Sequence, residues 1–189
     1  MAATQAQVSR QVAESFERLQ IRYLVWGSVA SSIYGTPRST FDIDILADIR
    51  EDHIAGLVQD FGQDFIVDAE AIEQSLRNHA SFNLLHTTGG YKVDIFPVAA
   101  STHHRKELDR AVREPYPAAG ENFEVPVASP EDTILSKLVW YRQGGEVSER
   151  QWNDVRGVNA VTGAHLDRAY LNEWAEALGV AALLRRVLT

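Results

Sequence analysis

Apolar residues recur along the first two thirds of the chain with two periods, one typical of helices and one typical of strands. Helical spacing predicts helices over about 5–20, 28–34, 52–61, 69–78 and 102–112. Short apolar or alternating runs predict strands over 23–26, 41–46, 65–67, 82–86, 91–96 and 123–127. The runs 82–86 and 91–96 flank a Thr-Thr-Gly-Gly turn, so we expect them to form a β-hairpin.

After residue 128 the pattern is helical to the end of the sequence, with glycine-containing breaks near 144, 163 and 179. The segment Ser129-Pro130-Glu131-Asp132 is a strong helix start, because it combines a capping serine, a proline in the first turn and an acid at the third position. The sequence therefore predicts a mixed α/β core over 1–128 and a helical portion over 129–189.

Composition narrows the class of protein without naming a function. Of the 189 residues, 45% are apolar and 23% are charged, which is the ordinary mix of a globular domain. No apolar run approaches the length of a membrane span and the first helix lacks a signal-peptide block, so we expect a cytoplasmic protein without a membrane partner. The absence of cysteine excludes disulfides and thiolate metal sites.

The formal net charge of −8 argues against a broad basic surface for duplex nucleic acid. A local basic patch stays open, because one predicted helical region carries Arg105, Lys106, Arg110 and Arg113, and Arg185-Arg186 lie near the end of the sequence. Such groups are more often ordinary helix surface.

Two aspartates share one face of the predicted strand 41–46. Side chains two apart in a strand point the same way, so Asp42 and Asp44 face away from the core, toward which Phe41, Ile43 and Ile45 are expected to point. Carboxylates roughly 7 Å apart on one strand repel each other, and a divalent cation between them would remove that repulsion. Mg²⁺ suits such a site because it takes oxygen ligands and often rests on carboxylates and substrate phosphates.

Asp94 takes the same kind of position in the predicted strand 91–96, between the apolar residues Val93 and Ile95. If the two strands are neighbours, three carboxylates converge on one or two metal ions, the arrangement used for phosphoryl displacement. The alternative is that these acids form only the solvated face of an edge strand. Gly27-Ser28 favours the metal site, since this pair lies where a strand turns into a helix, whose N-terminus attracts phosphate. We also expect Ser28 to cap that helix.

Together, Gly27-Ser28, the order Arg38-x-Thr40-x-Asp42-x-Asp44 and the later Val93-Asp94-Ile95 resemble the nucleotidyltransferase superfamily of the DNA-polymerase-β type. The similarity is greatest to small bacterial members of the abortive-infection and toxin–antitoxin kind. It implies a mixed β-sheet flanked by helices, with the C-terminal helices packed on this core. It also implies that Gly27 and Ser28 hold a nucleoside triphosphate, and that Asp42, Asp44 and Asp94 bind two Mg²⁺ ions and perform catalysis.

Four further residues are implied by the same resemblance to bind the nucleotide: Arg38, Thr40, Lys137 and Asp154. Arg38 either contacts phosphate or supports its loop. In similar proteins, a lysine on one C-terminal helix and an aspartate on the next face the active-site cleft. The alternatives are a surface role for Lys137, along the flank of its helix, and pairing of Asp154 with Arg150 four residues earlier.

His103 and His104, near Asp109, are expected to form a solvated helix start, because adjacent helical residues point about 100° apart and do not easily share a metal ion.

The resemblance implies Mg²⁺-dependent transfer of a nucleoside monophosphate from an NTP to a hydroxyl acceptor. A tRNA 3′ end, a partner protein and a small molecule remain open as acceptors, as does a role in toxin–antitoxin or phage-defence systems. One alternative is a catalytically inactive protein of the same fold that serves as a binding partner or antitoxin. Another is phosphate-ester hydrolysis, which would not need the phosphate site at Gly27-Ser28.

Overall fold

The computed structural model describes residues 3–98, 102–118 and 122–188. Its helices are α1 (Gln5–Arg18), α2 (Gly27–Tyr34), α3 (Ile54–Phe61, after the 3-10 turn η1, Glu51–His53), α4 (Ala69–Asn78), α5 (Thr102–Arg110), α6 (Pro130–Gln143), α7 (Glu149–Thr162), α8 (Arg168–Ala177) and α9 (Ala181–Leu188). Its strands are β1 (Tyr23–Val25), β2 (Asp42–Ala47), β3 (Phe65–Ile66), β4 (Phe82–His86), β5 (Lys92–Pro97), β6 (Val112–Pro115) and β7 (Glu124–Val127).

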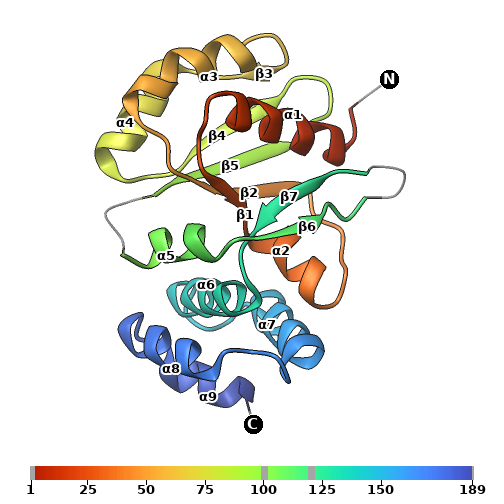
Figure 1. Cartoon of the computed structure of the whole chain (residues 1–189), viewed down its shortest axis with the longest axis vertical. Coiled ribbons are helices and arrows are strands. Elements are labelled where there is room, and N and C mark those ends of the chain that lie inside the picture. Colours follow the sequence, from red (N-terminus) through yellow and green to blue (C-terminus); the bar gives the residue numbers. More distant parts are fainter. Residues whose placement is uncertain (1–2, 99–101, 119–121, 189) are drawn as a thin grey trace.

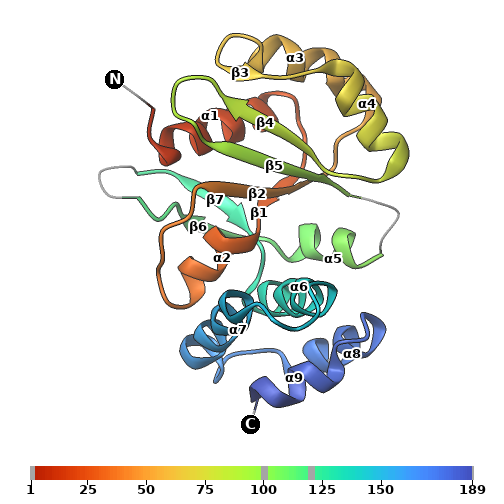
Figure 2. The same ribbon diagram turned by 180° about the vertical axis from the view of Figure 1, so that it is seen from behind.

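The strands form one mixed sheet in the order β3-β4-β5-β2-β1-β7-β6. The pairs β2–β5 and β1–β7 are parallel, and the remaining neighbours are antiparallel. Helices α1, α3 and α4 lie on one side of the sheet, whereas α2, α5 and the C-terminal helices lie on the other (Figures 1 and 2). This is the predicted mixed sheet with flanking helices, followed by a helical portion.

Alternation along β2 and β5 buries one face of the sheet, as the sequence predicts. Ile43, Ile45, Val93 and Ile95 are almost completely buried in the main core. The expectation that Phe41 joins them is wrong, because β2 begins only at Asp42 and Phe41 is 75% exposed. Its ring instead stacks on that of Tyr91, with 6.5 Å between the centroids.

The segment after α5 also differs from the expectation. The helix ends at Arg110, and residues 112–115 form the edge strand β6, paired antiparallel with β7. This strand is short and mostly exposed, so it has no apolar alternation by which the sequence could reveal it. Arg113 therefore lies on β6 and not on the helix with Arg105 and Lys106, and Arg110 pairs with Glu131. The four residues considered for a local basic patch therefore do not lie together on this helix.

Helix α6 is the central element of the C-terminal portion. It begins as predicted, since the Ser129 hydroxyl accepts a hydrogen bond from the backbone N–H of Asp132. It contacts α2, α7, α8 and α9, and nearly every residue of its first two turns is buried. The boundary between 1–128 and 129–189 stays a prediction. Among the described residues, no helix is long and apolar enough to cross a membrane.

Candidate active site

The parallel pairing of β2 with β5 brings the three predicted aspartates to one region of the sheet. In this register, Asp44 lies opposite Asp94, and Asp42 lies opposite Lys92. All four side chains point to the face opposite the buried isoleucines and valine, because neighbouring residues in register share a side of the sheet. The two strands are thus neighbours, as the metal-site hypothesis requires.

Gly27 allows the start of α2 to approach this group closely. Its φ of +62° lies in the left-handed region, and a Cβ at this position would collide with the Asp44 carboxylate. The backbone N–H of Ser28 donates a hydrogen bond to Asp44. The N-terminus of α2 and the carboxylate group therefore lie side by side, which places a phosphate-attracting helix end next to potential cation ligands.

Ser28 does not cap α2 as expected. The helix already includes Gly27, so its cap position is Trp26, whose side chain makes no capping hydrogen bond. The hydroxyl of Ser28 instead accepts a hydrogen bond of 2.5 Å from the guanidinium of Arg38. The cap residue therefore supplies no side-chain hydrogen bond to the first turn, and the Arg38 contact places a positive charge beside the start of the helix.

Arg38 and Lys137 both bind Asp154. Two guanidinium nitrogens of Arg38, Nε and one terminal nitrogen, each lie 3.0 Å from a different oxygen of the Asp154 carboxylate. Lys137 Nζ lies 2.8 Å from Asp154 Oδ2. These contacts join the loop after α2 to α6 and α7. The alternative pairing of Asp154 with Arg150 is replaced by these two partners, and the alternative of a surface role for Lys137 is wrong, since its side chain is only 1% exposed.

Burial perturbs the ionisation of this group. It raises the pKa of Asp44 to about 6, an effect that the charges of Asp94 and Asp42 increase and that Lys137 and the Ser28 N–H oppose. Burial also lowers the pKa of Lys137, partly offset by Asp154. For Asp154 burial alone would raise the pKa, but the contacts with Arg38 and Lys137 outweigh it and lower the pKa. Perturbed carboxylates in one cluster are typical of functional sites.

Lys92 is a member of the site that sequence reasoning missed. Its ammonium lies 2.8 Å from Asp94 Oδ2 and 3.9 Å from Asp42 Oδ1, and the hydrogen bond to Asp94 raises its pKa. Alternation in 91–96 places Lys92 on the face of Asp94, but only the strand register brings it opposite Asp42. A cation therefore already contacts two of the three carboxylates. The carboxylate oxygens are also of the ligand type that a divalent ion such as Mg²⁺ takes.

Thr40 supports the beginning of β2. Its hydroxyl donates a 3.2 Å hydrogen bond to the backbone carbonyl of Asp42. With Arg38, Phe41 and Tyr91 it lines a cavity of about 530 Å³ at the end of the sheet. The structure therefore brings all nine predicted residues into one region, although Thr40 and Arg38 contact protein groups that the sequence did not indicate.

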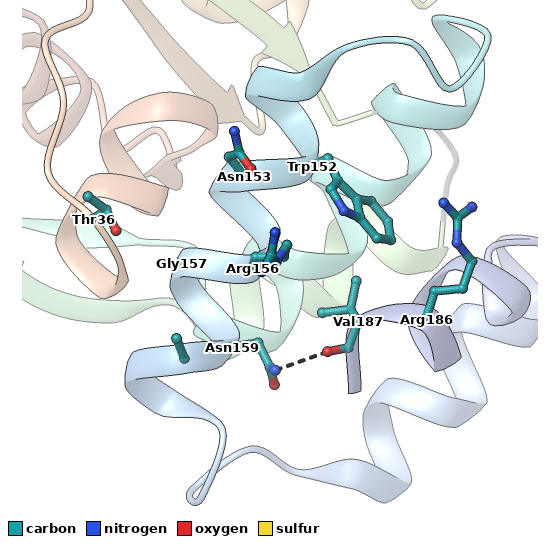
Figure 3. Close-up of a pocket in the computed structure, with 9 residues that line it drawn as sticks. Thr36, Trp152, Asn153, Arg156, Gly157, Asn159, Arg186 and Val187 are labelled. Atoms are coloured by element: carbon teal, nitrogen blue, oxygen red, sulfur yellow. Dashed lines mark hydrogen bonds between the residues drawn. The ribbon is translucent and has the colours of Figure 1, made fainter. Parts of the chain in front are cut away.

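A separate cavity of about 770 Å³ lies between α7, α9 and the loop after α2 (Figure 3). Trp152, Arg156 and Arg186 line it, and the guanidinium of Arg186 lies 4.7 Å from the centre of the Trp152 ring. None of the three aspartates lines this cavity. The candidate active site is therefore assigned to the aspartates at the sheet, where the carboxylate of Asp44 has a perturbed pKa, and not to this larger space.

The sequence matches no protein-family model and no curated protein. Several solved structures resemble the fold at low sequence identity. An antigenic nucleotidyltransferase-like protein from Paracoccidioides brasiliensis has a TM-score of 0.54 at 16% identity, and the match covers 100% of this chain and 94% of that protein's chain. The antibiotic-resistance factor ANT(2'')-Ia in complex with adenylyl-2''-tobramycin has a TM-score of 0.52 at 16% identity, and the match covers 97% of this chain and 99% of the other. Lincomycin-bound LnuA, a lincosamide antibiotic adenylyltransferase, has a TM-score of 0.50 at 16% identity, and the match covers 86% of this chain and 100% of the other. The chain thus has a nucleotidyltransferase fold.

Proposed function

We propose that the protein is a metal-dependent nucleotidyltransferase, which moves a nucleoside monophosphate from an NTP to an acceptor hydroxyl. The observation that carries this proposal is the close placement of Asp44, Asp94 and the Gly27 end of α2. It combines ligands for a cation with a helix N-terminus for an anion, the two requirements of an NTP·Mg²⁺ complex. The nucleotidyltransferase fold of the chain agrees with it.

In this proposal Asp42, Asp44 and Asp94 hold two Mg²⁺ ions. When bound, the metal polarises the α-phosphate and lowers the pKa of the acceptor hydroxyl. The N–H groups at the start of α2, Ser28 and the guanidinium of Arg38 bind the outer phosphates. The acceptor oxygen forms a bond to the α-phosphorus as the bond to the β-phosphate breaks, and pyrophosphate leaves. Asp94 accepts the acceptor's proton.

Lys137, Asp154 and Thr40 act as positioning residues in the same proposal. The buried Lys137–Asp154 pair fixes the orientation of Arg38, which in turn contacts Ser28. Thr40 holds the backbone of Asp42. These contacts keep the phosphate-binding groups in place before the nucleotide arrives, which lowers the cost of orienting it.

For the acceptor we propose a small molecule with a hydroxyl group. Arg110 is engaged by Glu131 and Arg113 lies on a different element, so the basic patch considered for a tRNA 3′ end is dispersed. Two of the similar structures contain an adenylyl-tobramycin and a lincomycin, respectively. A tRNA or a partner protein as acceptor, and a role in toxin–antitoxin or phage-defence systems, stay predictions that the experiment below distinguishes.

The test is incubation of the protein with each α-labelled NTP and Mg²⁺, in separate reactions with hydroxylated antibiotics, total tRNA and cell lysate. We expect label on a small molecule from the wild type and none from Asp44→Asn. Label on tRNA or protein would replace the proposed acceptor. If no acceptor is labelled but an NTP raises the melting temperature, hydrolysis is the next reaction to measure. If no NTP raises the melting temperature either, the inactive binding partner is the better interpretation.

A further inference from the structure

A second cluster of ionisable side chains lies outside the candidate active site, where α5 packs against α6. His103 and Glu107 are four residues apart on α5 and share one face of it, and Asp132 comes from the first turn of α6. The three residues are 5%, 0% and 0% exposed. One potential ligand atom from each lies within 4.8 Å of the others. Among the residues that the structure describes, this is the group of three His, Cys, Asp or Glu side chains whose potential ligand atoms lie so close together.

Glu107 has no hydrogen-bond partner for either carboxylate oxygen, although it is completely buried. The indole N–H of Trp26 faces this carboxylate but is itself without a hydrogen bond of good geometry. His103 Nε2 also makes no hydrogen bond. A buried polar group that makes no hydrogen bond destabilises the folded state, so this arrangement is unfavourable unless something binds to it.

Asp132, in contrast, is well positioned by its neighbours. The hydroxyl of Tyr170 donates to it at 2.6 Å and that of Ser129 at 2.8 Å. Arg110 Nε lies 3.4 Å from the same carboxylate while its terminal nitrogen binds Glu131. Such contacts fix the orientation of a carboxylate and are the outer partners that metal-binding residues commonly have.

The two ring nitrogens of His103 face two different carboxylates. Nδ1 lies 3.6 Å from Glu107 Oε2, and Nε2 lies 3.6 Å from Asp132 Oδ1. Ligand atoms around a tetrahedral zinc, with bonds of about 2.1 Å, lie about 3.4 Å apart. Each of the two separations is close to that spacing, but they involve different ring nitrogens, so only one of them is a distance between two ligands of the same ion.

We propose that His103, Glu107 and Asp132 bind a structural Zn²⁺ ion. Zinc takes one nitrogen and two carboxylate ligands readily and needs only four positions, whereas Mg²⁺ usually retains several waters, for which a buried cluster has little room. One imidazole nitrogen binds the ion and the other donates its proton to a carboxylate oxygen. The ion would hold α5 to the start of α6. This inference does not depend on the proposed transferase activity.

The test uses the full chain with Asp42→Asn and Asp44→Asn, so that metal bound at the sheet does not contribute. After removal of metals with a chelator and dialysis against Zn²⁺, we expect one equivalent of zinc by elemental analysis and a higher melting temperature. Adding Glu107→Gln, which keeps the volume and the polarity of the side chain, should remove the bound zinc or weaken its binding at least about tenfold.

His103→Gln should have the same effect, and His165→Gln, a change at an exposed histidine outside the cluster, should have none. Circular dichroism checks that each variant is folded. Should the chain with Asp42→Asn and Asp44→Asn bind no zinc, or should Glu107→Gln leave binding unchanged, the proposal is overturned. The three residues would then form a buried polar cluster that holds no metal.

Discussion

The ammonium of Lys137 on α6 lies 2.8 Å from the carboxylate of Asp154 on α7, and the two side chains are only 1% and 7% exposed. Arg38 completes the arrangement from the loop between α2 and β2. Three separate parts of the chain therefore meet at one carboxylate. Removing one partner of such a buried group leaves an uncompensated charge, which costs more than the pair itself contributes.

Asp154→Asn is expected to destabilise the protein by about 3 kcal/mol at neutral pH, because Lys137 then remains charged and buried without its counter-ion. Urea unfolding followed by circular dichroism measures the change in the free energy of unfolding. The control is Asp154→Asn combined with Lys137→Met, which removes both buried charges. If the double variant loses as much as the sum of the two single variants, the residues are not coupled.

The same carboxylate should give the stability a defined acid dependence. Arg38 and Lys137 hold the pKa of Asp154 below its ordinary value of 3.8, so the folded state binds this proton more weakly than the unfolded state does. The stabilisation is fully present above that value and is lost as the pH falls through the lowered pKa. The difference in free energy of unfolding between wild type and Asp154→Asn should thus shrink below about pH 4. A constant difference from pH 7 to pH 3 would contradict this assignment.

Gly27→Ala should damage both the fold and the site. The positive φ alone costs an alanine about 1–2 kcal/mol, and its Cβ would also displace the Asp44 carboxylate. Gly90→Ala is a matched control, since Gly90 has a similar φ of +66° but open space around it. We expect the Gly90 variant to show only the loss of stability from strain, measured by thermal unfolding. The Gly27 variant should additionally lose the rise in melting temperature caused by an NTP and Mg²⁺.

Asp44→Asn is expected to leave the protein folded while reducing nucleotidyl transfer by about a hundredfold or more, because it removes a carboxylate that we propose as a metal ligand. Folding should be retained, since Asp44 is buried beside Asp94 and Asp42, and the change relieves their repulsion. Asp48→Asn, at an acidic residue of the following loop that pairs only weakly with Arg50, serves as the control. Full activity in Asp44→Asn would falsify the assignment of the site to these aspartates.

Much of the local architecture could be predicted from short-range patterns. The strand-turn-helix at Gly27 and the faces of Asp42, Asp44 and Asp94 follow from spacing alone, because alternation and turn chemistry are local properties. The structure then places them as neighbours. Phe41 shows the limit of this reasoning, since it continues the alternation but lies one residue before the hydrogen-bonded strand begins.

Other features depend on which elements meet. Lys137 lies on the flank of an apolar stripe and is buried only because α7 brings Asp154 to it. Lys92 contacts Asp42 only through the register of two strands that are far apart in sequence. His103 is polar and lies near a helix start, yet the packing of α5 on α6 buries it beside Asp132. Tertiary contacts of this kind have no signature in a single local segment.

The parallel pairing at the centre of the sheet also determines when this site can exist during synthesis. Val25 of β1 pairs with Val127 of β7, and Asp154 reaches Arg38 from a helix still later in the chain. Contacts between residues so distant in sequence form slowly, because the intervening chain must be ordered first. A nascent chain that ends before α7 therefore contains all three aspartates but not the carboxylate that orients Arg38. The proposed phosphate-binding arrangement is therefore complete only once α7 has been made.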